Sequence, residues 1–158
     1  MGNASVISAP IPSSWDVKLR TSESKESSTL TAKTKLGESV TLLITAINIK
    51  KSITAKDRVA IVKKFRRTIE SQYKSYGNTK ELVSRPVKQA MNDGIGHLYT
   101  YVDESLLKAT KLPSGESIYA SAGIIIIDNI LITTTILTNN IDTDNYAKAL
   151  ATIHFLTN

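Results

Sequence analysis

The stretch from Ser117 to Thr138, SIYASAGIIIIDNILITTTILT, decides how this chain is expected to fold. Two β-branched runs flank Asp128-Asn129, a pair that tolerates the positive φ of a tight hairpin turn. This turn sets the register, in which Ile127 pairs with Ile130. Although the stretch carries a single charge, its polar centre and β-branched content favour strands over a membrane helix. We therefore predict a β-hairpin and no integral membrane segment.

Further strands are predicted on either side of the first helical region. Residues 15–20 alternate between apolar and charged side chains, which is typical of a half-buried strand. Strands at 28–34 and 39–49 follow, and their short connections favour an antiparallel meander. An extended segment over residues 97–108 leads into the hairpin and completes a second meander.

The helices are predicted from capping signals and apolar spacing. Thr54 and Asp57 resemble a capping box, and a helix that ends at Gly77-Asn78 follows. We expect its lysines to point outward and its sheet-facing side to consist of Val59, Val62, Phe65, Ile69, Tyr73 and Tyr76. Residues 79–92 are expected to form two short turns, or a second helix that begins near Pro86, because proline disrupts a helix interior. A terminal helix capped by Asp142 would carry the apolar residues Tyr146, Leu150 and Ile153.

Together these elements predict an α+β fold. Its antiparallel β-sheet would have about six strands in the order βββ-α-α-βββ-α, with helices packed on its faces. A length of 158 residues suits one domain. We expect a flexible segment over residues 1–14 and a single α+β domain over residues 15–158.

Composition excludes several kinds of chemistry. The chain has no cysteine, so disulfides, thiol nucleophiles and cysteine-ligated metals are ruled out. It has two histidines, and the Gly94-Ile95-Gly96 segment lacks the third glycine of a dinucleotide fingerprint. We predict no catalytic residue, no cofactor and no metal.

Charge is distributed unevenly along the chain. The net charge is +6, and residues 1–80 hold 15 Lys and Arg against 6 Asp and Glu. On the first helix the spacing predicts a basic stripe beside the apolar face, made of Lys56, Lys63, Arg67 and Lys74. Such a stripe would bind the phosphates of nucleic acid or lipid, or would simply be a solvated helix face. Arg66 falls inside the apolar arc and would reach its edge or pair with a carboxylate from the sheet.

A second group of candidate ligand-binding residues lies on the strand that precedes the hairpin. His97, Tyr99 and Tyr101 fall on one side of this strand. His97 is one of two residues that could serve as a catalytic base, and the tyrosines could stack on a ligand. Alternating tyrosines are also common in plain sheet packing. His154, the other histidine, is interpreted as a boundary residue of the terminal helix.

The chain resembles the PsbP-like fold family, which includes the DcrB-type exported bacterial proteins. The likeness is carried by Ile11-Pro12 followed by Trp15, and by ILITTTILTNN over residues 130–140 running into YAKAL over residues 146–150. It implies an antiparallel sheet with helices on its faces and an accessory, non-enzymatic role. The chain departs from the exported members because it shows neither a signal sequence nor a lipobox cysteine.

These observations order the expected functions. The first is a non-catalytic accessory protein that binds another protein. We expect such a protein to be periplasmic or secreted, with its leader removed from this chain, and a cytoplasmic location is the alternative. The second is a binding module for an anionic ligand, nucleic acid or phospholipid, and the third is a small hydrolase-like enzyme that uses His97. An uncovered strand edge would also permit a homodimer.

Overall fold

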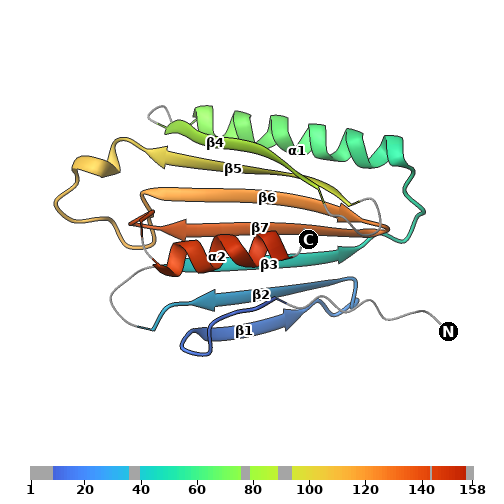
Figure 1. Cartoon of the computed structure of the whole chain (residues 1–158), viewed down its shortest axis with the longest axis horizontal. Helices are drawn as coiled ribbons and strands as arrows, with labels where there is room; N and C mark the ends of the chain where they lie inside the picture. Colours follow the sequence, from blue (N-terminus) through green and yellow to red (C-terminus); the bar gives the residue numbers. More distant parts are fainter. Residues whose placement is uncertain (1–8, 36–39, 76–78, 89–93, 143, 156–158) are drawn as a thin grey trace.

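One antiparallel sheet with two helices forms the fold in the computed structural model (Figure 1), which describes residues 9–35, 40–75, 79–88, 94–142 and 144–155. The strands are β1 (Asp16–Thr21), β2 (Ser27–Lys33), β3 (Val40–Asn48), β4 (Thr79–Lys88), β5 (Ile95–Asp103), β6 (Tyr119–Ile127) and β7 (Ile130–Thr138). The helices are α1 (Ala55–Ser75), the 3₁₀ turn η1 (Leu106–Lys108) and α2 (Asp144–Phe155). The predicted α+β class with an antiparallel sheet is confirmed.

Two meanders make up the seven-stranded sheet, whose strand order is β1-β2-β3-β7-β6-β5-β4. The first meander contains β1, β2 and β3, and the second runs from β4 to β7. An antiparallel pair between β3 and β7 joins them, with Leu42 opposite Ile136. The sheet therefore has two edges among the described residues, β1 and β4.

The predicted hairpin is confirmed together with its register. Ile127 pairs with Ile130, and Gly123 lies opposite Thr134. Asp128 has a φ of 49°, the left-handed conformation that the tight turn requires.

The prediction for residues 79–92 is wrong over the part that the structure describes. Residues 79–88 form strand β4 rather than helical turns, so the sheet has seven strands instead of about six. The strand contains Pro86, which pairs with His97 of β5. Because β4 is an edge strand, a proline that lacks an N–H donor is tolerated there. Residues 89–92 lie outside the described part of the chain.

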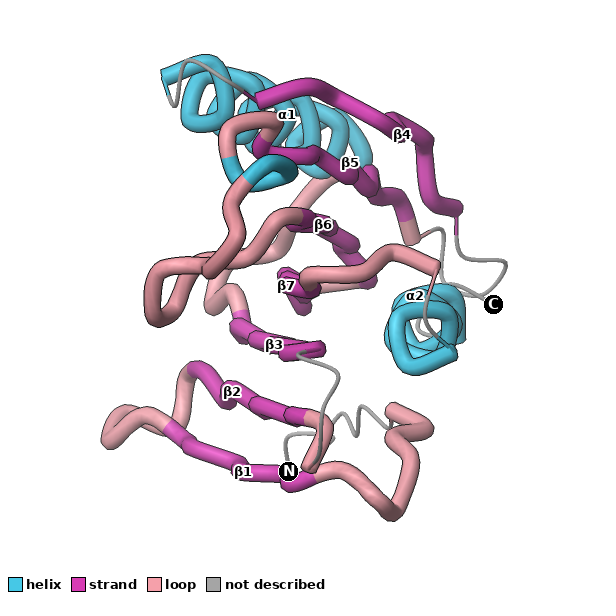
Figure 2. The backbone as a smooth tube through the Cα atoms, turned by 90° about the vertical axis from the view of Figure 1, so that its left-hand side faces the viewer, coloured by secondary structure: helices cyan, strands magenta, loops and turns pink. Residues whose placement is uncertain are grey.

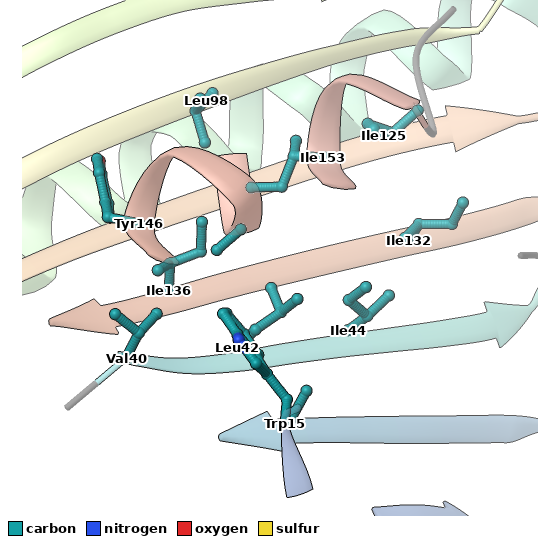
Figure 3. Packing of buried hydrophobic residues seen from close by; sticks show 12 residues of the cluster. Trp15, Val40, Leu42, Ile44, Leu98, Ile125, Ile132, Ile136, Tyr146 and Ile153 are labelled. Carbon is teal, nitrogen blue, oxygen red and sulfur yellow. The ribbon is translucent and has the colours of Figure 1, made fainter. Parts of the chain in front are cut away.

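A hydrophobic core fills the space between the sheet and α2 (Figure 3). It gathers one face of β3 and β7 with the apolar side of α2, and Figure 3 shows Leu42 and Ile136 pointing into this layer with Ile153 of α2. Trp15 closes the layer near β1, and its indole Nε1 donates to Oδ1 of Asn145 at 3.3 Å. The predicted stripe on α2 is confirmed, although the helix begins at Asp144, two residues after the predicted cap.

Three buried hydroxyl groups, from β5, β6 and α2, form a hydrogen-bonded row on the α2 side of the sheet. Thr100 Oγ1 and Ser121 Oγ lie 2.8 Å apart, and Ser121 Oγ lies 2.9 Å from the hydroxyl oxygen of Tyr146. Because these polar groups are hydrogen-bonded to one another, they are satisfied without water. The hydrogen bond between Ser121 and Tyr146 links α2 to β6.

The opposite face of the sheet carries α1, which lies against β4, β5 and β6 (Figure 2). A smaller core forms here from Ile69 and Phe65 of α1 with Tyr99 and Tyr101 of β5. Phe65 and Ile69 were predicted correctly, but Val59 is 59% exposed and does not pack on the sheet. On a helix of 3.6 residues per turn, Val59 lies about 100° away from the line of Phe65 and Ile69. The side chains of Tyr73 and Tyr76 and the predicted stop at Gly77-Asn78 fall outside the described residues.

The predicted capping box at the start of α1 is confirmed. The backbone N–H of Thr54 donates to Oδ2 of Asp57 at 3.0 Å, and the N–H of Asp57 donates to Oγ1 of Thr54 at 3.2 Å. The hydroxyl of Thr54 also donates to this carboxylate, at 2.6 Å. These hydrogen bonds lower the pKa of Asp57, the contact with the Thr54 side chain contributing most.

The stabilisation from this cap should depend on pH. A depressed carboxyl pKa stabilises the fold above the unfolded-state pKa of about 3.9, and the effect is lost as the pH falls through the lower, folded-state pKa. We expect Asp57→Ala to lower the melting temperature at pH 7 and the difference from the unmodified protein to shrink towards pH 2–3. Thermal melts across this range measure it; a difference that does not change with pH would contradict the assignment.

Among the described residues, no helix is packed against a large part of the sheet face that bears α1. Alternate residues of β2, β3 and β7 point to this side and are half-buried, and they are rich in threonine: Thr29, Thr31, Thr41, Leu43, Thr45, Thr133, Thr135 and Leu137. Oγ1 of Thr29 lies 3.0 Å from Oγ1 of Thr45 across the β2–β3 pair. We call this area the open face.

Candidate functional site

The predicted residues of β5 form an aromatic row beneath α1. The rings of His97 and Tyr99 are stacked with centroids 4.4 Å apart, and those of Tyr99 and Tyr101 lie 6.0 Å apart with nearly parallel planes. Residues two apart on a strand point to the same side, which is why the sequence pattern brings them together. Tyr99 and Tyr101 are buried, whereas His97 is half-buried. The row is therefore largely part of the packing between β5 and α1.

An ion pair on α1 lies near one end of this row. Nε of Arg66 donates to Oε1 of Glu70 at 2.7 Å, one helical turn away. The hydrogen-bond partner of Arg66 is thus on its own helix, whereas Glu81 of β4 acts on Arg66 only through its charge. Arg66 is exposed, in agreement with the predicted alternative that its side chain reaches the edge of the apolar face. Partial burial lowers the pKa of His97, the positive charge of Arg66 lowers it further, and Glu70 acts in the opposite direction.

His97 is therefore expected to be neutral at pH 7. A depressed histidine pKa means that the unfolded chain binds the proton more readily, so stability is fully present above about pH 6.5 and falls as the pH drops towards the folded-state pKa. We expect Arg66→Gln to raise the His97 pKa, measured from the imidazole resonances in an NMR titration. The variant His97→Gln should remove this part of the pH dependence. A His97 pKa above the ordinary value would contradict the position of His97 in a partly buried site near Arg66.

A pocket of about 410 Å³ opens at the other end of the row. Tyr101 and Asp103 of β5, Leu106 of η1, Glu116 and Leu137 are among its lining residues, with Gln72 of α1 above them. Asp103 already accepts hydrogen bonds from the N–H and the hydroxyl of Ser105, at 2.9 Å and 2.5 Å. The pocket adjoins the open face at Leu137, and it contacts the row through Tyr101.

The predicted basic stripe lies on the outer side of α1. Lys56, Lys63 and Arg67 are exposed, and the side chain of Lys74 lies outside the described residues. The sheet-packing line of α1 passes through Phe65 and Ile69, so the stripe lies on the opposite side of the helix rather than beside the apolar face. Among the described residues, the ion pairs of the molecule are Lys50–Glu26 and Arg66–Glu70, and neither involves this stripe.

The edge formed by β1 is a feature that sequence reasoning missed. All six residues of β1 are exposed, including Leu19 at 68% and Val17 at 46%, although the alternation had predicted a half-buried strand. The alternation is real, because Val17 and Leu19 point to the α2 side, beside Ala32 and Leu30 of β2. However, neither α1 nor α2 packs substantially against β1, and the strand neighbour of β1 among the described residues is β2.

The backbone of β1 also has hydrogen-bonding groups that face away from the sheet. Ser22 donates to the carbonyl of Ser27, so the even-numbered residues of β1 direct their N–H and C=O groups towards β2. The odd-numbered residues Val17 and Leu19 consequently direct theirs outward. The sequence carried one signal for this edge, the charged residues Asp16, Lys18 and Arg20, which are typical of unpaired strand edges.

The structure thus brings some predicted residues together and separates others. His97, Tyr99 and Tyr101 form one row, whereas Lys56, Lys63 and Arg67 lie on the far side of α1 and do not contact it. The side chain of His154 lies outside the described residues. Within the described segments, no three His, Asp or Glu side chains converge as a metal site would require. Neither α1 nor α2, over the residues described, has the length and apolar character needed to span a membrane.

Comparison with known proteins gives no relative: no family model matches the chain, and no curated protein or solved structure is significantly similar to it.

Proposed function

We propose that this chain is a non-catalytic binding protein that acts through protein–protein contact at the β1 edge. The observation that carries the proposal is that all six residues of β1 are exposed. Val17 and Leu19 form an apolar strip on a strand whose outer side has no strand partner among the described residues. An extended segment of a partner can add to such an edge as a further strand. Backbone hydrogen bonds would supply affinity, and the alternating side chains would supply specificity.

The pattern of covered and uncovered surfaces supports the same proposal. The aromatic row is packed beneath α1, and Trp15, Tyr99, Tyr101 and Tyr146 belong to the two cores. By contrast, β1 has a single strand neighbour among the described residues, and all six of its residues are exposed. A sheet with one helix on each face also agrees with the resemblance to PsbP-like proteins, from which we infer an accessory role in an exported, periplasmic or secreted chain.

Photo-crosslinking from the edge tests the proposal. A benzophenone amino acid at position 19, introduced in cells that carry the gene, should form an adduct with a second polypeptide. The matched control is the same probe at Val59, which is similarly exposed at 59% but lies on α1. The proposal fails if position 19 gives no more adduct than position 59.

A proline variant makes the test specific for strand addition. Val17→Pro removes an outward N–H and leaves the hydrogen bonds between β1 and β2 in place, because the backbone groups of residue 17 do not face β2. We expect Val17→Pro to abolish the adduct from position 19 and Val17→Thr to preserve it. An adduct that survives Val17→Pro would exclude backbone pairing as its cause.

A second candidate function is the binding of an anionic ligand by the basic stripe, favoured by the exposure of Lys56, Lys63 and Arg67 without ion-pair partners among the described residues. Replacing these three residues and Lys74 with glutamine should reduce retention on heparin and on anionic phospholipid vesicles. With duplex DNA as the ligand, it should also flatten the salt dependence of binding, by about 0.9 in the slope of log K against log salt for each phosphate that the variant no longer neutralises. The matched control removes four exposed charges elsewhere, at Lys33, Lys35, Lys108 and Lys111; equal retention in both variants would end this candidate.

A further inference from the structure

We propose that the partner at the β1 edge is a second copy of this chain, paired with β1 in an antiparallel register centred on Lys18. The inference rests on the proposed function of the edge and goes beyond it by naming the occupant and the register. It is argued from the charge and apolar pattern of six exposed residues, DVKLRT over residues 16–21.

The geometry of the edge limits the registers that a symmetric pair can adopt. A two-fold axis perpendicular to the joint sheet makes the two copies of β1 antiparallel and keeps each face of the sheet continuous. Residues opposite each other then share a face, so even-numbered residues oppose even-numbered ones. Val17 and Leu19 satisfy this condition. Both are odd-numbered and direct their backbone groups outward, so they can form the hydrogen-bonded pairs between the two copies.

The registers centred on Lys18 and on Leu19 overlap most of the exposed strand, and the side chains distinguish them from each other and from the shorter overlap centred on Val17. With Lys18 at the axis, Asp16 lies opposite Arg20 of the second copy, and the symmetry repeats this opposite-charge pair. In the same register Val17 lies opposite Leu19 of the second copy, again twice. Every residue from 16 to 20 except the central lysine then has a complementary neighbour.

The two neighbouring registers are less complementary. Centring on Leu19 places Lys18 opposite Arg20 twice, which juxtaposes like charges. Centring on Val17 pairs Asp16 with Lys18, but it sets Leu19 opposite Trp15. The N–H of Trp15 donates to the carbonyl of Pro12 at 3.0 Å and its side chain is buried, so Trp15 cannot continue the ladder.

The chosen register also extends the apolar surface of the α2 side. Leu19 lines a small groove of about 110 Å³ with Ala9, Leu30 and Ile44. In the pair, Val17 of the second copy would lie next to Leu19, so an apolar row would run from Ile44 through Leu30 and Leu19 into the second copy. The charged residues Asp16, Lys18 and Arg20 would lie on the other side, level with the open face.

Lys18 is the residue that keeps the association weak. At the two-fold axis it meets its own copy, and like charges directly opposite each other destabilise a strand pair. A central lysine is also a common means of preventing edge-to-edge aggregation. We therefore expect a reversible dimer, and a tighter one when the charge is removed: Lys18→Thr should strengthen dimerisation by up to about fivefold, measured by sedimentation equilibrium.

Cysteine crosslinking tests the register, because the chain contains no other cysteine. Residues facing each other in a non-hydrogen-bonded antiparallel pair have Cα atoms about 4.5 Å apart, within the range that a disulfide can bridge. Lys18→Cys should therefore give a covalent dimer under mild oxidation. Neither Asp16→Cys nor Arg20→Cys alone should do so, but a mixture of the two should. Preferential crosslinking of Val17→Cys or Leu19→Cys instead would overturn the register.

Charge exchange provides a test that does not depend on disulfide chemistry. Asp16→Arg and Arg20→Asp should each weaken dimerisation by about tenfold, because each replaces two attractive pairs with two repulsive ones. The double variant Asp16→Arg/Arg20→Asp exchanges the charges and should restore association. Failure of the double variant to recover, with both variants folded by circular dichroism, would count against the pairing.

The mass of the photo-crosslinked adduct from position 19 separates this inference from the proposed function. An adduct at twice the mass of the chain supports the dimer. An adduct of any other mass that is sensitive to Val17→Pro means that the edge binds a different protein, so the function stands and the dimer is wrong. Absence of any adduct refutes both.

Discussion

Gly96→Ala is expected to lower the free energy of unfolding by about 3 kcal/mol. A Cβ atom at this position would lie 2.2 Å from the carbonyl oxygen of Ile124 and 3.0 Å from Cγ1 of Ile125. The first of these is a backbone atom of the neighbouring strand β6, so it cannot move aside without disturbing the β5–β6 pair. Urea denaturation followed by circular dichroism measures the effect.

Gly115→Ala is the matched control, because the two glycines are special for different reasons. Gly115 has a φ of 87°, and nothing lies within 4 Å of the position of its missing Cβ atom. Its replacement should cost about 1 kcal/mol from backbone strain alone. If Gly96→Ala lowers the free energy of unfolding no more than Gly115→Ala does, β5 does not approach β6 as closely at Gly96 as described here.

Leu42→Ala is expected to cost about 2–5 kcal/mol, the usual range for a buried leucine. Leu42 has 0% exposure and packs in the core beneath α2. Since a whole domain is stable by only about 5–15 kcal/mol, this variant should be close to unfolding. The measurement is again the free energy of unfolding from urea denaturation.

Leu43→Ala serves as its control, because adjacent residues of a strand point to opposite faces. Leu43 is half-buried on the open face, and its truncation should cost about 1 kcal/mol. The comparison keeps the strand, the residue type and the chain position nearly constant. Equal losses would mean that the open face is covered in solution, contrary to the arrangement described above.

Much of the fold was predictable because its signals are local. The hairpin at Asp128 and its register follow from a two-residue turn between β-branched runs, and the start of α1 follows from the hydrogen-bonding capacity of Thr54 and Asp57. Likewise, the alternation on β5 correctly separates Leu98 from Tyr99, which belong to different cores.

The errors concern features that depend on where an element lies in the sheet. Residues 79–92 were predicted to form two short turns, or a helix beginning near Pro86, because the sequence does not reveal that β4 is an edge strand, where proline is tolerated. The alternation of β1 predicted a buried side at Leu19, but burial requires a covering layer, and neither helix packs substantially against this edge.

The candidate sites illustrate the same limit. The spacing of Lys56, Lys63 and Arg67 correctly placed them in one stripe. The position of this stripe relative to the sheet depends on which side of α1 packs against the sheet. Val59 was predicted to lie on that side, but it is exposed. The pocket beside Tyr101 joins residues from α1, β5, η1 and β7, so no local pattern could have indicated it.

The position of Trp15 makes its intrinsic fluorescence a probe of the packing of α2. It is the single tryptophan of the chain, and its indole bridges the start of the edge strand and Asn145 at the beginning of α2. Departure of α2 from the sheet would expose this indole to water and shift its emission to longer wavelength. Fluorescence would therefore follow the docking of the C-terminal helix separately from the melting of the β-structure, which circular dichroism reports.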